Sequence, residues 1–204
     1  MPLLGGTTTA VLRRMEGEYE RSDTLSAPTV VAMYAAYGAH LAALVWAVNQ
    51  RVWPVQLPLR ACRIAGSMLT VLGVGIALAG ARPFGAGAQI SGILPGSLHT
   101  SGIYRYSRNP QYLGVGLAAT ATALAARSAF AGLLAAGVWA SYRRWIPSEE
   151  RHLTRIFGND YADYRTRVRR WLGPAHHTDD ATAQAQGRQH RLAASTCRSE
   201  TGRG

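Results

Sequence analysis

The sequence contains no lysine, few carboxylates and only two cysteines. Of its 204 residues, 22 are basic, all of them arginine, and 11 are aspartate or glutamate. Charged residues make up 16% of the chain, which is well below the ~25% that is common in soluble domains. The low charge excludes a highly charged disordered chain, and the two cysteines exclude a small fold held by disulfides. The length suits one ordinary domain or a small membrane protein.

Carboxylates are missing altogether from one long part of the chain. No aspartate or glutamate occurs between residues 24 and 148, a stretch of 125 residues that contains nine of the arginines. The net charge of +11 would by itself suggest a nucleic-acid-binding protein. The arginines of this stretch, however, stand between long uncharged runs, and the chain carries no nucleic-acid-reading motif. We therefore predict no nucleic-acid partner.

The sequence does contain long uncharged runs. Residues 27–50 and 64–81 carry no charge, and a helix needs about 20 apolar residues to cross a hydrocarbon core of ~30 Å. Two shorter runs, rich in alanine and glycine, follow later in the chain. We predict an all-α polytopic membrane bundle with about four transmembrane helices, at residues 28–50, 61–81, 111–126 and 128–145. The alternative is a soluble bundle with buried, alanine-rich helices.

The last two predicted helices are joined almost without a loop. Their uncharged runs meet at Arg127–Ser128, which predicts a tight helical hairpin with its tip there. Small residues such as Gly114, Gly116 and Gly132 would let the two helices of this hairpin approach closely.

The positions of the arginines predict how the bundle is oriented. Most of them lie in residues 1–26, in residues 82–111 and after residue 142, and cytoplasmic segments of membrane proteins are enriched in arginine. We expect both termini in the cytoplasm and the bundle in the bilayer of a bacterial plasma membrane, because exclusive use of arginine and abundant alanine are typical of a GC-rich bacterial genome. No metal site and no obligate protein partner are indicated.

The composition also divides the chain into three parts. Residues 1–26 are expected to form a polar N-terminal segment, and residues 27–174 the membrane domain. Residues 175–204 are expected to be a disordered tail, because they lack aromatic residues and nearly all large aliphatic ones.

The loop before the hairpin, residues 98–114, is dense in groups that bind anions and planar rings. Arg105 and Arg108 offer forked donors for a carboxylate or phosphate, and three tyrosines offer ring faces. Asn109 and Pro110 predict the N-cap and first turn of the next helix, whose free N–H groups favour an anion. Interfacial arginines and tyrosines would give the same composition, so the loop by itself leaves both interpretations open.

Glu149 and Glu150 are the first carboxylates after the acid-free stretch. One interpretation places them in the first turn of a helix that Ser148 caps. The other is that one of them faces the loop and pairs with Arg105 or Arg108, or binds the ammonium group of a ligand.

Residues 148–172 predict interfacial helices that follow the last transmembrane helix. Gly158 and Asn159 are typical of one helix end and the next helix start. Beyond them, four large residues recur at helical spacing among arginines: Tyr161, Tyr164, Val168 and Trp171. We expect a basic amphipathic helix that lies on an anionic membrane surface.

Taken in order, these motifs resemble one superfamily. The chain reads G-x-Y-x-x-x-R-N-P-x-Y-x-G from Gly102 to Gly114, and E-E-x-x-L-x-x-x-F-G-x-x-Y-x-x-Y-x-x-x-V from Glu149 to Val168. Residues 98–174 are thus similar to the isoprenylcysteine carboxyl methyltransferase and phospholipid methyltransferase superfamily of integral membrane enzymes. The resemblance implies that S-adenosylmethionine binds in a cytoplasmic pocket and that its methyl group passes to a lipophilic acceptor. The cofactor site that it implies consists of Gly102, Tyr104, Arg105, Arg108, Asn109, Pro110, Tyr112, Leu113, Gly114, Glu149 and Glu150.

The implied reaction leaves the acceptor open. The catalytic candidates are Arg108, Glu149, Glu150 and His99; an amine acceptor would need His99 or Glu149 as a base, whereas a carboxylate acceptor would need none. Asn109 stands where the prenylcysteine enzymes have histidine, so their substrate is not implied. Two other functions remain open: an NADPH-dependent membrane reductase of the sterol reductase type, and a non-catalytic membrane protein of the same frame. The adjacent glutamates favour methyl transfer.

Overall fold

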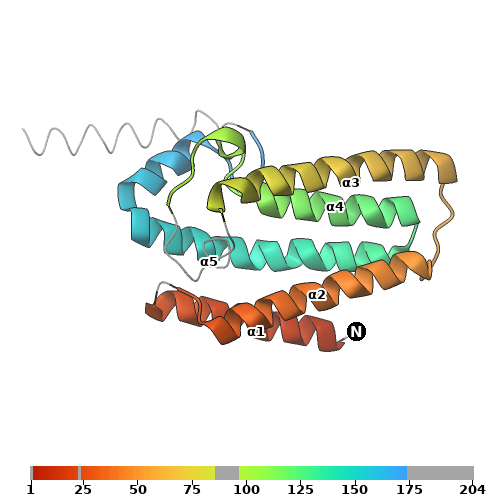
Figure 1. The fold of residues 1–204 in the computed structure, drawn as a ribbon, viewed down its shortest axis with the longest axis horizontal. Coiled ribbons are helices and arrows are strands. Elements are labelled where there is room, and N and C mark those ends of the chain that lie inside the picture. Colours follow the sequence, from red (N-terminus) through yellow and green to blue (C-terminus); the bar gives the residue numbers. More distant parts are fainter. Residues whose placement is uncertain (1, 23, 86–96, 174–204) are drawn as a thin grey trace, which may run out of the picture.

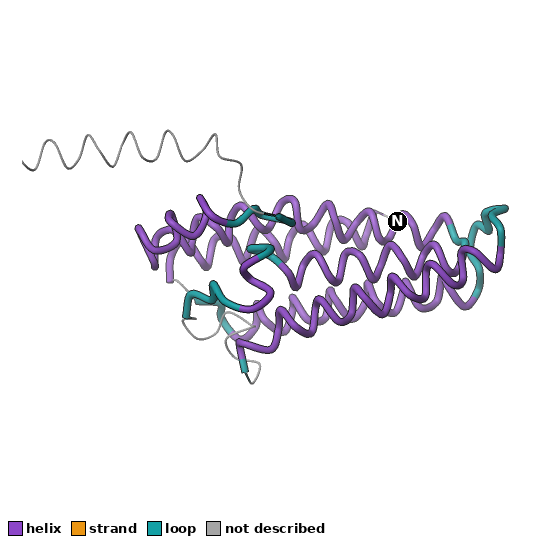
Figure 2. The backbone as a smooth tube through the Cα atoms, turned by 90° about the horizontal axis from the view of Figure 1, so that it is seen from above, coloured by secondary structure: helices purple, strands orange, loops and turns teal. Residues whose placement is uncertain are grey.

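The computed structural model describes residues 2–22, 24–85 and 97–173, and these residues form helices and loops without a strand. The elements are α1 (Pro2–Ser22), α2 (Ala27–Asn49), α3 (Leu59–Ala81), η1 (Arg82–Phe84), η2 (Gly102–Arg105), α4 (Pro110–Ala126) and α5 (Ala129–Arg167). The long helices lie side by side along one axis (Figures 1 and 2). One end of the bundle carries the α2–α3 connection and the α4–α5 turn; we call it the turn end. The opposite end, the loop end, carries η2 and the last part of α5.

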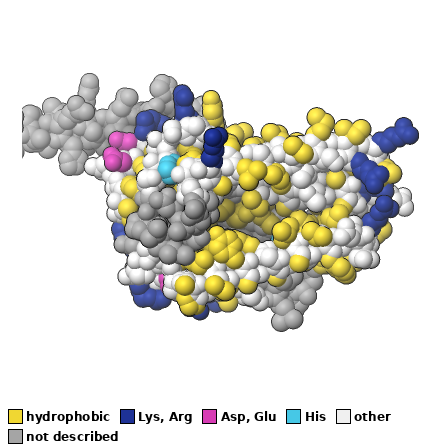
Figure 3. Space-filling model, in the orientation of Figure 1, with side chains coloured by type: hydrophobic (Ala, Val, Ile, Leu, Met, Phe, Trp, Pro, Cys, Tyr) yellow, Lys and Arg dark blue, Asp and Glu magenta, His cyan; other side chains and the backbone are white. Residues whose placement is uncertain are grey.

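Two of the helices, Ala27–Asn49 and Leu59–Phe84, are long and apolar enough to cross a membrane. Only 22% and 17% of their apolar windows are buried, so neither is the core helix of a soluble bundle. Their large side chains, among them Val31, Ile64 and Val71, point outward, and Figure 3 shows hydrophobic atoms spread along the middle of the molecule. This surface suits lipid as the solvent. The four predicted segments all form helices, but α4 has 17 residues, and a count of four spans stays a prediction.

Small residues bring α3 and α4 into close contact. Gly66, Gly73 and Gly80 recur every seven residues on α3, and a Cβ atom at any of them would lie within 3 Å of α4 atoms. From the other side, a Cβ at Gly114 would lie 2.4 Å from the backbone nitrogen of Ala77. Our prediction that Gly114 and Gly132 tighten the last hairpin is therefore wrong, because Gly114 faces α3 and Gly132 faces open space. Gly116 does face α5, against Trp139.

The turn between α4 and α5 has its tip where the sequence predicts it. Arg127 ends α4 in the left-handed conformation, with φ of 52°. Ser128 caps α5, since its side chain accepts a hydrogen bond from the N–H of Ala131.

The N-terminal segment forms a full helix, which the sequence analysis did not predict. Leu12 and Met15 of α1 are buried in a cluster with Trp145 of α5. Glu18 accepts hydrogen bonds from the Ser26 N–H (2.8 Å) and the Thr29 hydroxyl (2.6 Å) at the start of α2. Burial raises the pKa of Glu18, but these hydrogen bonds outweigh it and lower the pKa to about 2. Glu18 thus satisfies donors at the first turn of α2 and fixes α1 to it.

Helix α5 continues through the point at which we predicted a new start. Ser148 is buried inside it rather than at an N-cap, and the helix contains Pro147. A proline costs one backbone hydrogen bond, yet the helix continues through it, with the preceding Ile146 fully buried. The break comes at Gly158, whose φ of 50° confirms a helix end there.

The last part of α5 is not free to lie on a membrane with its apolar face. The helix ends at Arg167, five residues before the predicted boundary. Tyr161, Tyr164 and Val168 are buried in a cluster with Tyr104, so the predicted membrane-facing side packs inside the protein.

Candidate active site

The loop that carries the glycine, tyrosine and arginine motif is held against the helices by its tyrosine. Gly102 begins η2 with φ of 60°, a left-handed conformation that favours glycine. The buried Tyr104 donates a hydrogen bond from its hydroxyl to the Gly80 carbonyl at the end of α3 (2.9 Å). The Tyr164 hydroxyl donates to the Tyr104 carbonyl (2.7 Å). Tyr104 therefore positions the loop, and its buried ring is not an exposed stacking platform.

The loop also pairs with the chain that follows α5. The Arg108 N–H donates to the Arg169 carbonyl (3.0 Å), and the Gly173 N–H donates to the Tyr106 carbonyl (2.9 Å). Asn109 occupies the N-cap position of α4 without a capping side-chain bond. Its side-chain amide instead donates to the Arg170 carbonyl (3.1 Å). The predicted N-cap position of Asn109 is confirmed, but its side chain joins the loop to the C-terminal segment instead of bonding to the first turn of α4.

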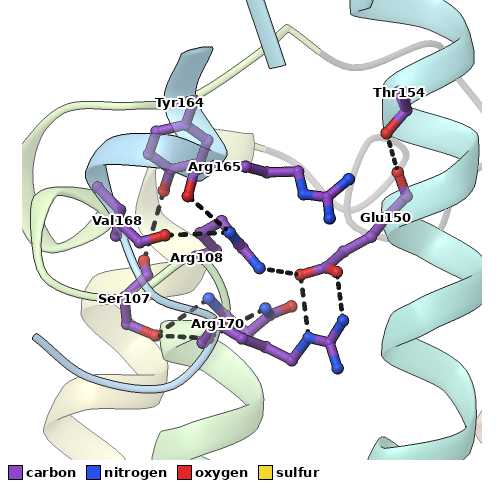
Figure 4. Close-up of polar contacts among 9 residues, drawn as sticks. Ser107, Arg108, Glu150, Thr154, Tyr164, Arg165, Val168 and Arg170 are labelled. Atoms are coloured by element: carbon purple, nitrogen blue, oxygen red, sulfur yellow. Dashed lines mark hydrogen bonds and ion pairs between the residues drawn. The ribbon is translucent and has the colours of Figure 1, made fainter. Parts of the chain in front are cut away.

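A buried ion cluster lies between α5, the loop and this segment (Figure 4). Glu150 accepts hydrogen bonds from Arg108 Nη2 (2.9 Å) and from Arg170 Nε (3.2 Å) and Nη2 (2.6 Å). Arg108 Nη1 donates to the carbonyls of Arg165 and Val168 at the C-terminal end of α5. Burial raises the pKa of Glu150, but the two guanidinium groups outweigh it and hold the pKa below its usual value. The predicted pairing of a glutamate with Arg108 is confirmed.

This cluster leaves few groups free for a ligand. Both carboxylate oxygens of Glu150 and both terminal nitrogens of Arg108 have partners. Within this cluster, Arg108 Nε is buried and has no hydrogen-bond partner among the described residues, and a buried donor of this kind needs an acceptor. Among the described residues, Glu150 and Arg108 therefore bind each other, and Arg108 also binds the C-terminal end of α5.

Glu149 points into a different environment, which is aromatic. The Trp145 indole N–H donates to the Tyr112 hydroxyl (2.9 Å), which in turn donates to Glu149 Oε2 (2.9 Å). Tyr142 lies beside Tyr112, with 4.7 Å between ring centroids, and Tyr19 lies beside Trp145 at 5.4 Å. Burial raises the pKa of Glu149 to about 7, against the hydrogen bond from Tyr112 and together with the charge of Glu150. A carboxylate among aromatic faces suits a cation, and a pKa near neutrality suits proton transfer.

The remaining predicted residues are placed around these two centres. Arg105 is exposed, and Leu113 and Tyr112 are partly buried at the start of α4. Pro110 is buried in the first turn of α4, as predicted. Gly114 packs against α3, so the structure gives it a packing role. His99 stacks edge-on against Phe84 at 4.7 Å and has no contact with either glutamate in the described residues.

Two residues of this site were not identified from the sequence. Arg170 was assigned only to a basic surface helix, and no spacing rule joins it to Glu150. Tyr19 lies in the segment that we considered only polar. The spacing of Leu12, Met15 and Tyr19 is helical, and this was the signal that could have revealed α1. No group of three or more metal-binding side chains occurs within residues 2–22, 24–85 and 97–173.

The pKa of Glu149 predicts the pH dependence of stability. The folded protein holds this proton up to about pH 7, whereas the unfolded chain releases it near its ordinary pKa of 4.5. The wild type should therefore lose stability as the pH rises between these values. Glu149→Gln cannot titrate and can still accept from Tyr112, so above pH 7 it should be about 2 kcal/mol more stable than the wild type. Thermal unfolding in detergent between pH 4 and 9 measures this; parallel pH curves would contradict it.

Comparison with known proteins gives one match. Residues 61–160 match the model of the phospholipid methyltransferase family (PEMT). This segment contains all but the first two residues of α3, and all of η2, α4 and the two glutamates. No curated protein and no solved structure matches the chain. The resemblance seen in the motifs is thus confirmed: the match at residues 61–160 lies within the superfamily of membrane methyltransferases that includes the isoprenylcysteine carboxyl and phospholipid methyltransferases.

Proposed function

We propose that the chain is a membrane-embedded methyltransferase that uses S-adenosylmethionine to methylate a lipophilic acceptor. Its family implies methyl transfer in general. The observation that supports S-adenosylmethionine as the cofactor is that the two adjacent glutamates lie in different environments. Glu150 holds two arginines, which leaves one positive charge and the Arg108 Nε donor for an anion, while its neighbour Glu149 lies among aromatic rings and suits a cation. The cofactor carries both kinds of group.

The residues present fit this cofactor. Its carboxylate can accept a hydrogen bond from Arg108 Nε, the buried donor without a partner, or from the exposed Arg105. Its ammonium and sulfonium are cations that suit Glu149 and the rings around it. When bound, it supplies an electrophilic methyl group. The chain's own part is to orient the reactants and to exclude water, which contribute most in a displacement of this type.

Glu149 is the better of the two candidate bases. Its pKa of about 7 lets it accept the proton that an amine acceptor must lose, and Tyr112 holds its carboxyl group in place. His99 packs against Phe84 instead. A carboxylate acceptor would leave Glu149 without this role, so the pH dependence of turnover separates the two classes of acceptor.

We further propose four transmembrane helices, with both chain termini and the loop end in the cytoplasm of a bacterium. This orientation is supported by the arginines of the loop end, which include Arg82, Arg105, Arg143 and Arg144. The water-soluble cofactor would then reach the loop directly, and the acceptor would arrive from the bilayer.

Cofactor binding tests the proposal directly. The full chain in nanodiscs should show a higher melting temperature with S-adenosylmethionine and no change with NADPH. Methyl-labelled cofactor and a bacterial lipid extract should give a labelled lipid product, which would also identify the acceptor. A shift with NADPH alone, or cofactor binding without label transfer, would contradict the proposal.

A conservative variant can test the anion-binding part of the site. Arg105 is exposed and has no partner among the described side chains, so Arg105→Gln should fold normally. We expect about tenfold weaker binding of S-adenosylmethionine, because a charge-assisted hydrogen bond is lost. Arg151→Gln is the control, since Arg151 is an exposed arginine of α5. Isothermal titration should separate the two variants, and equal affinities would remove Arg105 from the site.

A further inference from the structure

Three arginines at the turn end face one cavity. A cavity of about 600 Å³ lies where α2, α3 and α4 meet, and its lining includes Arg51, Arg63 and Arg127. Arg51 follows α2, Arg63 lies in the second turn of α3, and Arg127 ends α4. Figure 3 shows basic side chains gathered at this end of the molecule. The volume is that of a small-molecule site.

These three charges lack a carboxylate partner in the described part of the chain. The ion pairs found there join Arg14 to Glu18, Arg108 and Arg170 to Glu150, and Arg144 to Glu16. All of these lie outside the cavity. The acid-free stretch of 24–148 contains all three cavity arginines, so no acid close in sequence can neutralise them. Grouped like charges need a counter-anion, most of all beside a membrane.

Two of the arginines stand at turns of the chain, and the side chain of one of them, Arg127, is held by a hydrogen bond. Arg51 and Arg127 have φ of 47° and 52°, a region that glycine or asparagine occupies more readily. Arg127 Nη1 donates to the Leu57 carbonyl (2.8 Å), and the Val55 N–H donates to the Arg127 carbonyl (2.8 Å). The α2–α3 connection and the α4–α5 turn are thus joined around Arg127, so this arginine has a fixed place at the cavity.

The lining combines charged, polar and apolar side chains. Ser67 lies one helical turn beyond Arg63 on α3, and Thr70 follows it in the cavity wall. The Thr70 and Thr122 hydroxyls lie 3.3 Å apart and join α3 to α4. Val48 and Val71 add apolar surface. Three cationic side chains beside hydroxyl groups and apolar surface suit an amphiphile with an anionic head better than a free ion.

We propose that this cavity binds the phosphate headgroup of an anionic phospholipid. The three arginines would pair with the phosphate, and the acyl chains would leave along the outward-facing apolar side chains of α2 and α3. This lipid is not the methyl acceptor, because the 17-residue α4 separates the cavity from the loop end by ~25 Å. In the proposed orientation it belongs to the outer leaflet.

The source of the anion can be tested with three additives. Thermal unfolding of the full chain in detergent should show a higher melting temperature with phosphatidylglycerol. Phosphatidylcholine, in which a quaternary ammonium balances the phosphate, and inorganic phosphate should give little or no shift. A shift of equal size with inorganic phosphate would overturn the assignment to a lipid, and an equal shift with phosphatidylcholine would overturn the selectivity for an anionic head.

A matched pair of variants assigns the effect to the cavity. Arg63→Gln should weaken phosphatidylglycerol binding about fivefold, whereas Arg60→Gln, three residues earlier on α3 and outside the lining, should not. Native mass spectrometry of retained phosphatidylglycerol gives a second readout that does not depend on unfolding. Equal retention in both variants would overturn the proposal, whether or not their melting temperatures differ.

Discussion

Glu150→Ala should destabilise the protein by about 3–5 kcal/mol. The variant leaves the guanidinium of Arg108, whose side chain is only 10% exposed, without its counter-charge. A buried charge that loses its partner costs far more than the pair contributed. Arg108 also accounts for hydrogen bonds to two carbonyls at the end of α5, so the loop and the C-terminal segment should loosen together. Chemical unfolding in detergent measures the loss.

Glu16→Gln is the control for this prediction. Glu16 pairs with Arg144 at 3.2 Å, and the two side chains are 22% and 45% exposed. An exposed pair contributes at most ~1 kcal/mol, so this variant should unfold almost as the wild type does. If the Glu150 and Glu16 variants lost equal stability, the cluster around Glu150 would not be the anchor of the loop.

Gly114→Ala should cost about 3 kcal/mol, although it adds a single methyl group. The new carbon would lie 2.4 Å from the Ala77 nitrogen and 2.5 Å from the Gly73 carbonyl oxygen. Both are backbone atoms, so no side chain can turn away and the two helices must separate. Gly132→Ala is the control, because its Cβ would meet nothing within 4 Å. That variant should be neutral or slightly stabilised, since alanine favours a helix over glycine.

The same pair of variants tests the role that the motif gives to Gly114. The resemblance places this glycine in the cofactor site, whereas the structure places it between α3 and α4. In the fraction of Gly114→Ala protein that folds, we therefore expect S-adenosylmethionine affinity to fall only if the loop end is displaced, and not through loss of a direct contact to the cofactor. Normal stability with abolished binding would contradict the packing role.

The ends of α2, α3 and α4 could be predicted from the sequence because long uncharged runs stop at charged residues. Charges are costly in hydrocarbon, and the uncharged runs that stop at Arg51, Arg82 and Arg127 mark the C-terminal ends of these three helices. Local chemistry also revealed the breaks at Gly158 and at Arg127–Ser128. These features depend on neighbours in sequence.

The partners across the bundle could not be predicted in this way. Arg170 reaches Glu150 only because the chain changes direction after Gly158. No residue near Arg170 in the sequence indicates this change, so the contact could not be predicted. Which helix a glycine faces depends on the rotation of whole helices, so Gly114 was assigned to the wrong neighbour. Adjacent glutamates in a helix point about 100° apart, and only the packed structure shows that Glu149 and Glu150 serve different environments.

The length of α5 sets the depth of the site. In the proposed topology α5 begins at the outer surface with Ala129, and its uncharged residues up to Tyr142 rise ~20 Å before Arg143 and Arg144, so that Glu149 lies ~10 Å beyond this uncharged run. The two carboxylates therefore come level with the lipid headgroups, where a soluble cofactor and a membrane-bound acceptor can meet. The number of residues in α5 before the glutamates therefore sets their depth in the membrane. Removing one helical turn before Trp139 would move both carboxylates ~5 Å towards the hydrocarbon core, away from a cofactor that arrives from water.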